Sequence, residues 1–249
     1  MTLTDPAVLF AAPFIVLAAY TVFGISGFGS SLISIPLLAH FLPLKVVVPL
    51  MVLLDFTAAL TSGLRQRTEV DRAEVRSVLP GMAVGIIGGV VLLSNLPGEP
   101  LLMGLGVFIV GFGLFSLLRR HPLPALPRAA AFPTGFIGGL LGALFGTGGP
   151  IYVVYFSSRL HDPAKLRATL SVVFTLSTGL RITMFVVSGL LLDWHLLAAA
   201  VLLSPLMLLG TRLGQRIHLA LSRAQIARVI SVLLIASGAS LIAKGLSLH

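Results

Sequence analysis

Two glycine-rich breaks interrupt long apolar stretches of this sequence, and they are its clearest candidates for chemistry. The first reads Gly-Ile-Ser-Gly-Phe-Gly-Ser-Ser over residues 24–31, and the second reads Gly-Thr-Gly-Gly-Pro over residues 146–150. Glycine lets a backbone turn sharply and approach a ligand closely. Free N–H groups at the start of a helix, together with the helix dipole, favour an anion. The breaks therefore predict an anion site built largely from backbone donors.

Side chains in and just after the breaks can add donors to such a site. Hydroxyl groups occur in both breaks, and Pro150 suits a first helical turn, where its missing N–H costs nothing. The residues expected to bind substrate from the two breaks are Ser26, Gly27, Gly29, Ser30, Ser31, Thr147, Gly148, Gly149, Pro150 and Tyr152. The alternative is that the glycines only allow close helix packing, as small residues do in membranes.

Asp55 and Arg181 are the only formal charges well inside the long apolar segments that we predict to span a membrane. Burying a charge in a bilayer costs at least about 2.5 kcal/mol, so such residues usually face a cavity or the protein interior. Arg181 is expected to hold the anion, and Asp55 is expected to carry a coupling proton. A structural ion pair between them is equally consistent with the sequence. Lys45, at the entrance of a predicted span, is a further candidate ligand or an anchor at the membrane interface.

The composition places these residues in a membrane. Of the 249 residues, 57% are hydrophobic and only 10% are charged, whereas soluble chains carry roughly 25% charged residues. Charge is absent from residues 6–39, 77–98, 100–118 and 129–158, and runs of about 18 apolar residues indicate membrane-spanning helices. These features exclude a soluble enzyme and a DNA-binding domain, so the net charge of +9 predicts no nucleic-acid partner. They predict an all-α polytopic membrane protein in contact with the lipid bilayer.

The apolar segments form two similar series, which we predict to be repeats within one membrane domain. Residues 23–24 recur as 145–146, and residues 79–85 align with 204–210. The pieces beside the breaks are about 12–25 Å long as helices, short of a roughly 30 Å hydrocarbon core, which predicts a re-entrant or broken hairpin in each half. The first repeat is residues 1–120, with a hairpin at 8–40 and helices at 45–64, 79–96 and 101–118. The second is residues 121–249, with a hairpin at 129–158 and helices at 166–190, 196–211 and 226–246.

The charges of the loops predict the orientation. Lysine and arginine gather in the loops at 65–76, 119–128, 159–167 and 212–228, whereas loops 97–100 and 191–195 carry only acidic charges. The positive-inside rule places the first four in the cytoplasm and both termini in the periplasm. Equivalent loops of the two halves then face opposite sides, which makes the repeats inverted. Inverted repeats with broken helices at a central site are typical of secondary transporters.

The breaks, each followed by a short apolar helix, resemble those of the TauE/SafE sulfite exporter family, also called TSUP. Residues 146–156, followed by residues 166–170, are similar to the second half of that family, and residues 24–36 are similar to its first half. The resemblance covers nearly the whole chain. It implies a carrier in the bacterial inner membrane for sulfite, organosulfonates or related anions. The first break departs from the family's commoner glycine triplet, because Ser26 and Phe28 interrupt it.

We therefore expect a secondary transporter of a small sulfur-containing oxyanion that works by alternating access and is driven by the proton motive force. A passive anion channel and a non-transporting membrane scaffold are the alternatives. Residues 24–27 also fit the motif around the nucleophile of an intramembrane serine protease, but all six histidines fall at segment ends, in loops or at the terminus, and the nucleophile needs a base. No enzyme activity, cofactor or metal is expected. The sequence leaves open the anion, the direction of transport, sodium coupling and the oligomeric state.

Overall fold

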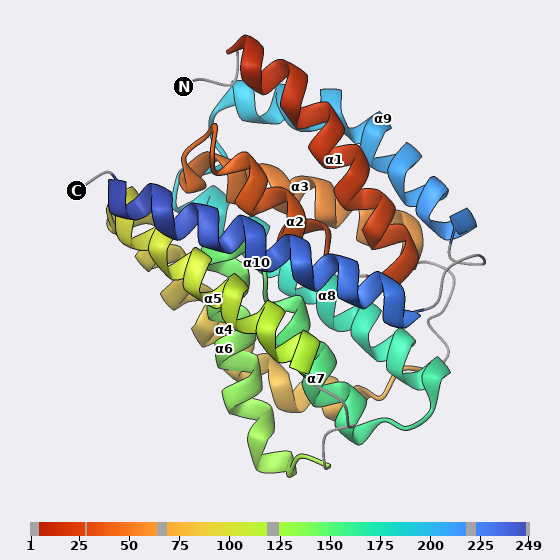
Figure 1. The fold of residues 1–249 in the computed structure, drawn as a ribbon. Coiled ribbons are helices and arrows are strands. Elements are labelled where there is room, and N and C mark those ends of the chain that lie inside the picture. The colour runs from red at the N-terminus through yellow and green to blue at the C-terminus, as the bar shows by residue number, and fades with distance from the viewer. Residues whose placement is uncertain (1–4, 28, 64–68, 119–124, 218–222, 248–249) are drawn as a thin grey trace.

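A computed structural model describes residues 5–27, 29–63, 69–118, 125–217 and 223–247 (Figure 1). The described residues form helices joined by short turns, and they contain no strand. The helices are α1 (Pro6–Ser26), α2 (Ser30–Leu38), α3 (Leu44–Gly63), α4 (Arg72–Asn95), α5 (Gly98–Leu118), the short 3-10 helix η2 (Arg128–Ala130), α6 (Ala131–Phe145), α7 (Gly149–Arg159), α8 (Pro163–Val187), α9 (Trp194–Ile217) and α10 (Arg223–Ser247).

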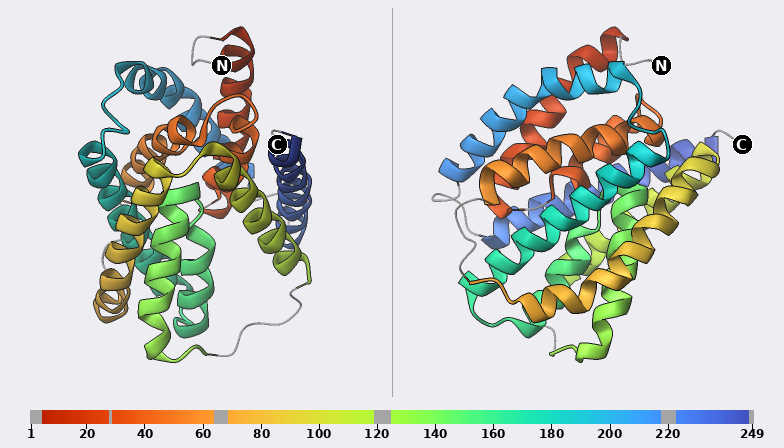
Figure 2. Two further views of the ribbon diagram at one scale, coloured as in Figure 1. Left: turned by 90° about the vertical axis from the view of Figure 1, so that its left-hand side faces the viewer. Right: turned by 180° about the vertical axis from the view of Figure 1, so that it is seen from behind.

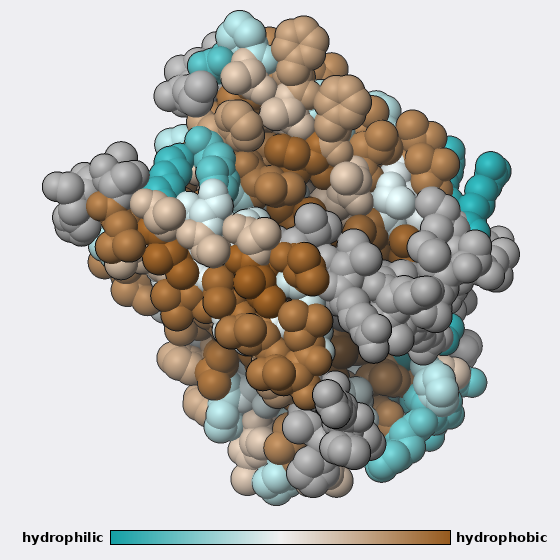
Figure 3. Space-filling model, in the orientation of Figure 1, coloured by the Kyte–Doolittle hydropathy of each residue, from teal (hydrophilic) through white to brown (hydrophobic). Residues whose placement is uncertain are grey.

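Seven helices in the described residues are long and apolar enough to cross a membrane. Their lipid-facing character shows in exposed apolar side chains such as Phe10, Phe14 and Val187, whose exposed fractions are 74%, 73% and 77%. Apolar residues cover much of the face seen in Figure 3, and hydrophilic residues gather towards its edges. The all-α polytopic membrane fold is thus confirmed.

The two short helices directly follow the breaks, as the sequence predicts. Helix α2 has 9 residues and α7 has 11, or about 14 and 17 Å at 1.5 Å per residue, so neither can cross a bilayer alone. Helix α1 differs from the prediction, because its 21 residues give about 31 Å, enough to cross. It continues through Gly24, where an added Cβ would lie 2.3 Å from the Thr211 carbonyl oxygen of α9. Gly24 is therefore a packing glycine within a helix, and the break begins at Gly27.

Local signals in the sequence explain where the helices start and stop. Asp71 caps α4 by accepting from the Ala73 and Glu74 N–H groups, and Asp162 caps α8 by accepting from the Ala164 N–H, since a side-chain oxygen can satisfy the free N–H groups of a first turn. These caps make the predicted loops at 65–76 and 159–167 shorter than expected. Their basic residues at 72, 76, 165 and 167 lie within the first two turns of α4 and α8.

The most extensive helix contacts join the two halves of the chain, pairing α4 with α6, α5 with α10 and α1 with α9. These pairs lie side by side in Figures 1 and 2. Their backbones approach closely at glycines, since an added Cβ at Gly85 would lie 2.1 Å from the Phe136 carbonyl oxygen, and one at Gly210 would lie 2.6 Å from that of Leu17. Close packing through small residues is thus the role of these glycines, as expected for helices in lipid.

Long-range hydrogen bonds fasten the first end of the bundle, where α1 begins and α10 ends (Figures 1 and 2). Lys244 Nζ donates to the carbonyl oxygens of Ala39 and His40, at 3.1 and 2.9 Å. Lys45 Nζ donates to the Ser94 carbonyl oxygen at 2.8 Å. The positive charge of Lys45 therefore lies at the C-terminal end of α4, where the helix dipole favours a cation.

The second end of the bundle carries the helix ends that flank all four basic loops. Here the Asp71 N–H donates to Thr169 Oγ1 at 3.0 Å, which ties α4 to α8. Arg159 forms an ion pair with the largely buried Glu74 at 2.6 Å, and Tyr155 donates to the same carboxylate at 3.0 Å. These contacts join the end of α7 to the start of α4.

Candidate anion-binding site

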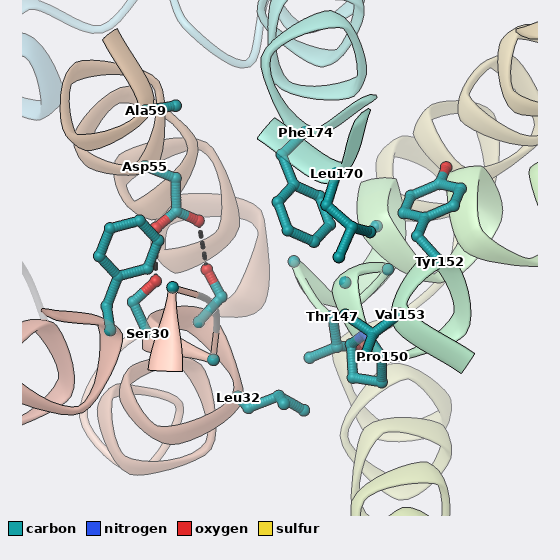
Figure 4. Close-up of a pocket in the computed structure, with 18 of the residues that line it drawn as sticks. Ser30, Leu32, Asp55, Ala59, Thr147, Pro150, Tyr152, Val153, Leu170 and Phe174 are labelled. Atoms are coloured by element: carbon teal, nitrogen blue, oxygen red, sulfur yellow. Dashed lines mark hydrogen bonds between the residues drawn. The ribbon is translucent and has the colours of Figure 1, made fainter. Parts of the chain in front are cut away.

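A cavity of about 750 Å³ lies where the two breaks come together (Figure 4). Residues of both breaks line it, as do Asp55 of α3 and Arg181 of α8. Figure 4 shows Ser30 and Asp55 on one side of the space, and Thr147, Pro150 and Tyr152 on the other. The structure therefore brings together the two kinds of candidate that the sequence singles out, the breaks and the charges within the spans.

The turn of each break depends on glycines with a left-handed backbone. Gly27, Gly29 and Gly146 have φ values of 79°, 97° and 65°, a conformation that residues with a Cβ rarely adopt. Gly149, by contrast, is the first residue of α7 and is not among the positive-φ glycines. The glycine at which the chain turns in the second break is thus Gly146, which is not among the site residues predicted from the sequence.

The two breaks also touch each other. A Cβ added at Gly146 would lie 2.3 Å from Ile35 Cδ1 and 3.3 Å from Ser31 Oγ. Both of these side chains belong to α2 and are buried. The absence of a side chain at Gly146 therefore allows the second break to rest directly on the short helix that follows the first.

The carboxylate of Asp55 accepts hydrogen bonds from three hydroxyl groups. Oδ1 accepts from Tyr20 at 2.7 Å and from Ser30 at 2.8 Å, and Oδ2 accepts a short hydrogen bond from Ser31. The first break thus directs its serine hydroxyls at a carboxylate supplied by the chain itself. Tyr20, from α1, was not predicted, because one tyrosine in an apolar helix carries no pattern that reveals its partner.

The guanidinium group of Arg181 is buried, with 6% of the residue exposed. Nη1 donates to the Gly142 carbonyl oxygen at 2.7 Å, and Nη2 lies 3.5 Å from Thr178 Oγ1. The structure records no ion pair between Arg181 and Asp55, both of which lie in its described part. The two charges face one cavity without neutralising each other through direct contact.

Three buried polar atoms around the second break have no hydrogen-bond partner among the described residues. They are Thr147 Oγ1, Tyr152 Oη and Arg181 Nε, and their residues are 1%, 1% and 6% exposed. Buried polar groups are nearly always paired, because an unpaired one costs about 1–3 kcal/mol. All three residues line the cavity and can donate a hydrogen bond, which is the chemistry that an oxyanion needs.

Comparison with known proteins places the chain in a family. Residues 12–241 match the profile of the family described as "Sulfite exporter TauE/SafE". The chain belongs to the TauE/SafE family.

Two known proteins are similar to this TauE/SafE protein over most of its length. "Probable inner membrane transporter protein TsaS" of Comamonas testosteroni is 30% identical over 193 residues, which cover 77% of this chain and 81% of the relative. "Probable sulfite/organosulfonate exporter TauE" of Cupriavidus necator is 30% identical over 232 residues, which cover 90% of this chain and 89% of the relative. No solved structure matches the chain. The protein is thus a multi-pass membrane protein of a transporter family.

One candidate residue lies away from the site, and the side chain of another falls outside what the structure describes. In this TauE/SafE protein, Lys45 is engaged at the end of α4 and is not among the residues that line the cavity. The side chain of Ser26 falls outside the described part of the chain, although its backbone ends α1. Arg167, which was not predicted, lines the cavity near the start of α8, and Gln215 lines it near the end of α9. The cavity thus extends from the breaks towards the second end of the bundle, which carries the helix ends that flank the basic loops.

Proposed function

We propose that this protein is a secondary transporter that carries a small sulfur-containing oxyanion, such as sulfite or an organosulfonate, across the bacterial inner membrane. The family and the name of the Cupriavidus relative support the substrate class. The observation that carries the proposal is the set of three unpaired buried donors at the second break. The cavity volume falls within the range of small-molecule sites.

The electrostatics around the second break support an anion as the occupant. Helix α7 starts at Gly149, and a helix N-terminus carries about half a positive charge. The charged residues among the described residues that line the cavity are Asp55, Arg167 and Arg181, which carry a net positive charge when all three are ionised. A sulfonate group, with three oxygen acceptors, can pair with several of the free donors at once.

We propose that the carrier uses alternating access between inverted repeats with the boundaries 1–120 and 121–249. In that alignment α1 corresponds to α6 and α4 to α9. The first helix of each half packs against the fourth helix of the other, because α1 contacts α9 and α4 contacts α6. Gly85 and Gly210, which are equivalent in the alignment, each lie in one of these two interfaces. This reciprocal packing of equivalent helices supports a two-fold axis that relates the two repeats, as in secondary transporters with inverted repeats.

A carrier is favoured over a passive channel because the first end of the bundle is packed. Ile35 and Leu38 of α2 are fully buried between the cavity and this end, and Lys244 joins α10 to the turn after α2. A channel needs a continuous water path. We therefore propose that the cavity opens to one side at a time, with Asp55 carrying the proton that couples transport to the proton motive force.

We predict that the second end of the bundle, whose helix ends flank the basic loops, faces the cytoplasm. His161 lies in the turn between α7 and α8, and Leu192, which is 72% exposed, lies in the turn between α8 and α9. His161→Cys should react with a membrane-impermeant thiol reagent only in inverted vesicles, and Leu192→Cys only in intact cells with a permeable outer membrane. Labelling is specific because the chain has no cysteine. Labelling of both positions from one side would contradict the orientation of α8.

The anion site is tested by removing a donor that has no partner among the described residues. Thr147→Val should weaken sulfonate binding by about 1–1.5 kcal/mol, or about 5- to 13-fold, because the hydroxyl is replaced by a methyl group. It should not lower the unfolding temperature, since the Thr147 hydroxyl makes no hydrogen bond that folding depends on. Calorimetric titration and thermal unfolding of the purified variant measure the two effects.

The matched control is Thr211→Val. Thr211 also lines the cavity and is buried, but its hydroxyl donates to the Met207 carbonyl oxygen at 2.9 Å within α9. This variant should bind the sulfonate with nearly the wild-type affinity. Equal losses of affinity in the two variants would contradict an anion site at Thr147.

A further inference from the structure

Ser31 occupies a particular place between the two halves of the cavity. It is the donor to Oδ2 of Asp55, whereas Tyr20 and Ser30 both donate to Oδ1. Its Oγ also lies 3.3 Å from the position of a Cβ at Gly146, directly before Thr147. Ser31 is therefore the hydroxyl that donates to the carboxylate and also lies beside the second break.

The direction of this hydrogen bond depends on the protonation of Asp55. An ionised carboxylate only accepts, so the single hydroxyl hydrogen of Ser31 is committed to Oδ2. If Oδ2 takes up a proton, the carboxyl group becomes the donor and Ser31 Oγ becomes the acceptor. The hydrogen of Ser31 is then released and can be donated to an oxyanion at the second break.

We propose that Ser31 is a hydrogen-bond switch that makes oxyanion binding at the second break depend on protonation of Asp55, so that one proton and one anion bind together. This inference rests on the function proposed above. Two effects act in the same direction. Protonation frees the Ser31 donor, and it also removes a negative charge that repels the anion across the cavity.

Asp55 is assigned the proton because it is the one carboxylate among the described residues that line the cavity. From α1 it faces the hydroxyl of Tyr20, from α2 it faces Ser30 and Ser31, and from α8 the charge of Arg181 acts on it across the cavity. The residues of α9 that line the cavity, Thr211 and Gln215, do not titrate, and Arg167 of α8 stays charged. No second carboxylate and no histidine is among the described residues that line the cavity.

Thermodynamic linkage makes the switch measurable. If protonation strengthens anion binding, then anion binding must strengthen protonation by the same factor. The wild type should take up a proton from the buffer when it binds a sulfonate, and its affinity should fall by as much as about tenfold for each unit of rising pH. A monoanion bound with one proton also moves without net charge, so a membrane potential alone should not drive its transport.

The experiment counts protons during binding of isethionate, whose sulfonate stays a monoanion throughout. The full-length protein in detergent is titrated calorimetrically in Bis-Tris and in Tris, two amine buffers that differ in their heat of ionisation and contain no oxyanion to compete for the site. The variants are Asp55→Asn, Ser31→Ala and, as the matched control, Ser30→Ala, which removes a donor to the other carboxylate oxygen. Monodispersity on size exclusion confirms that each variant is folded.

We expect proton uptake approaching one per isethionate in the wild type, none in Asp55→Asn, and less than half of the wild-type uptake in Ser31→Ala. Ser30→Ala should bind more weakly but keep the wild-type proton uptake. Asp55→Asn should also bind with an affinity that does not change with pH.

Each remaining outcome counts against one of the two proposals. Isethionate binding by the wild type without proton uptake overturns the switch and the proton coupling through Asp55, and leaves the proposed sulfonate binding and transport intact. Equal proton uptake in Ser31→Ala and the wild type overturns the role of Ser31. No binding of isethionate by the folded wild type overturns the proposed sulfonate function itself, and the switch with it.

Discussion

Arg181→Gln should weaken sulfonate binding by at least about 30-fold. Arg181 is a buried cation at the cavity, and its Nε has no hydrogen-bond partner in the part of the chain that the structure describes. Removing one partner of a buried, hydrogen-bonded charge pair typically costs about 2–5 kcal/mol, which corresponds to about a 30- to 5000-fold weaker affinity. Calorimetric titration of the folded variant, together with uptake of a labelled sulfonate into proteoliposomes, measures the loss.

Arg181→Lys is the control that separates charge from geometry. Lysine keeps the positive charge but cannot both donate to the Gly142 carbonyl oxygen, as Nη1 does, and offer a second donor from a rigid planar fork. We expect it to recover only part of the affinity. Wild-type affinity in Arg181→Gln would show that the anion is held elsewhere.

A double variant separates a coupling role of Asp55 from a structural one. If Asp55 served only to neutralise Arg181, Asp55→Asn combined with Arg181→Gln would recover expression and transport. The structure records no direct ion pair between the two side chains, so we expect the double variant to fold but not to transport. Recovery of transport would contradict the proposed roles of both residues.

Gly146→Val should separate the two breaks and abolish sulfonate binding. The φ of Gly146 is 65°, and a left-handed conformation costs a residue with a Cβ about 1–2 kcal/mol. The new side chain would also meet Ile35 Cδ1 at 2.3 Å and Ser31 Cβ at 3.2 Å. Both neighbours lie in a buried helix with little room to move, so the second break must shift away from α2. Binding is measured by titration and folding by thermal unfolding.

Gly189→Ala is the control that measures the cost of the left-handed backbone conformation without the steric clash. Gly189 has a φ of 81°, but an added Cβ there has no atom within 4 Å, and the residue lies in the turn between α8 and α9, away from the cavity. This variant should lose about 1–2 kcal/mol of stability and keep its affinity. If Gly146→Val binds as well as Gly189→Ala, the contact between the breaks is not needed for the site.

The sequence by itself determines the class of protein and the position of the breaks. Long uncharged runs can only be buried in lipid, so composition alone indicates a polytopic membrane protein. The positions of α2 and α7 follow from glycine and proline chemistry within a few residues. Asp55 and Arg181 stand out for a similar local reason, because charges in apolar segments are costly unless they face a cavity.

The partners of these residues are decided only by the tertiary structure. Nothing near residue 20 in the sequence indicates that Tyr20 donates to Asp55, and nothing near residue 45 indicates that Lys45 caps α4. Equally, Gly24 and Gly27 look alike in the sequence, yet Gly24 packs α1 against α9 while Gly27 turns the chain. Propensity and hydrophobicity act over a few neighbouring residues, whereas a hydrogen bond or a close backbone contact depends on which helices pack together. The sequence therefore supplies the residue types of the site. Only the packing of the helices decides which of its hydrogen-bond donors have a partner in the protein and which are left for a ligand.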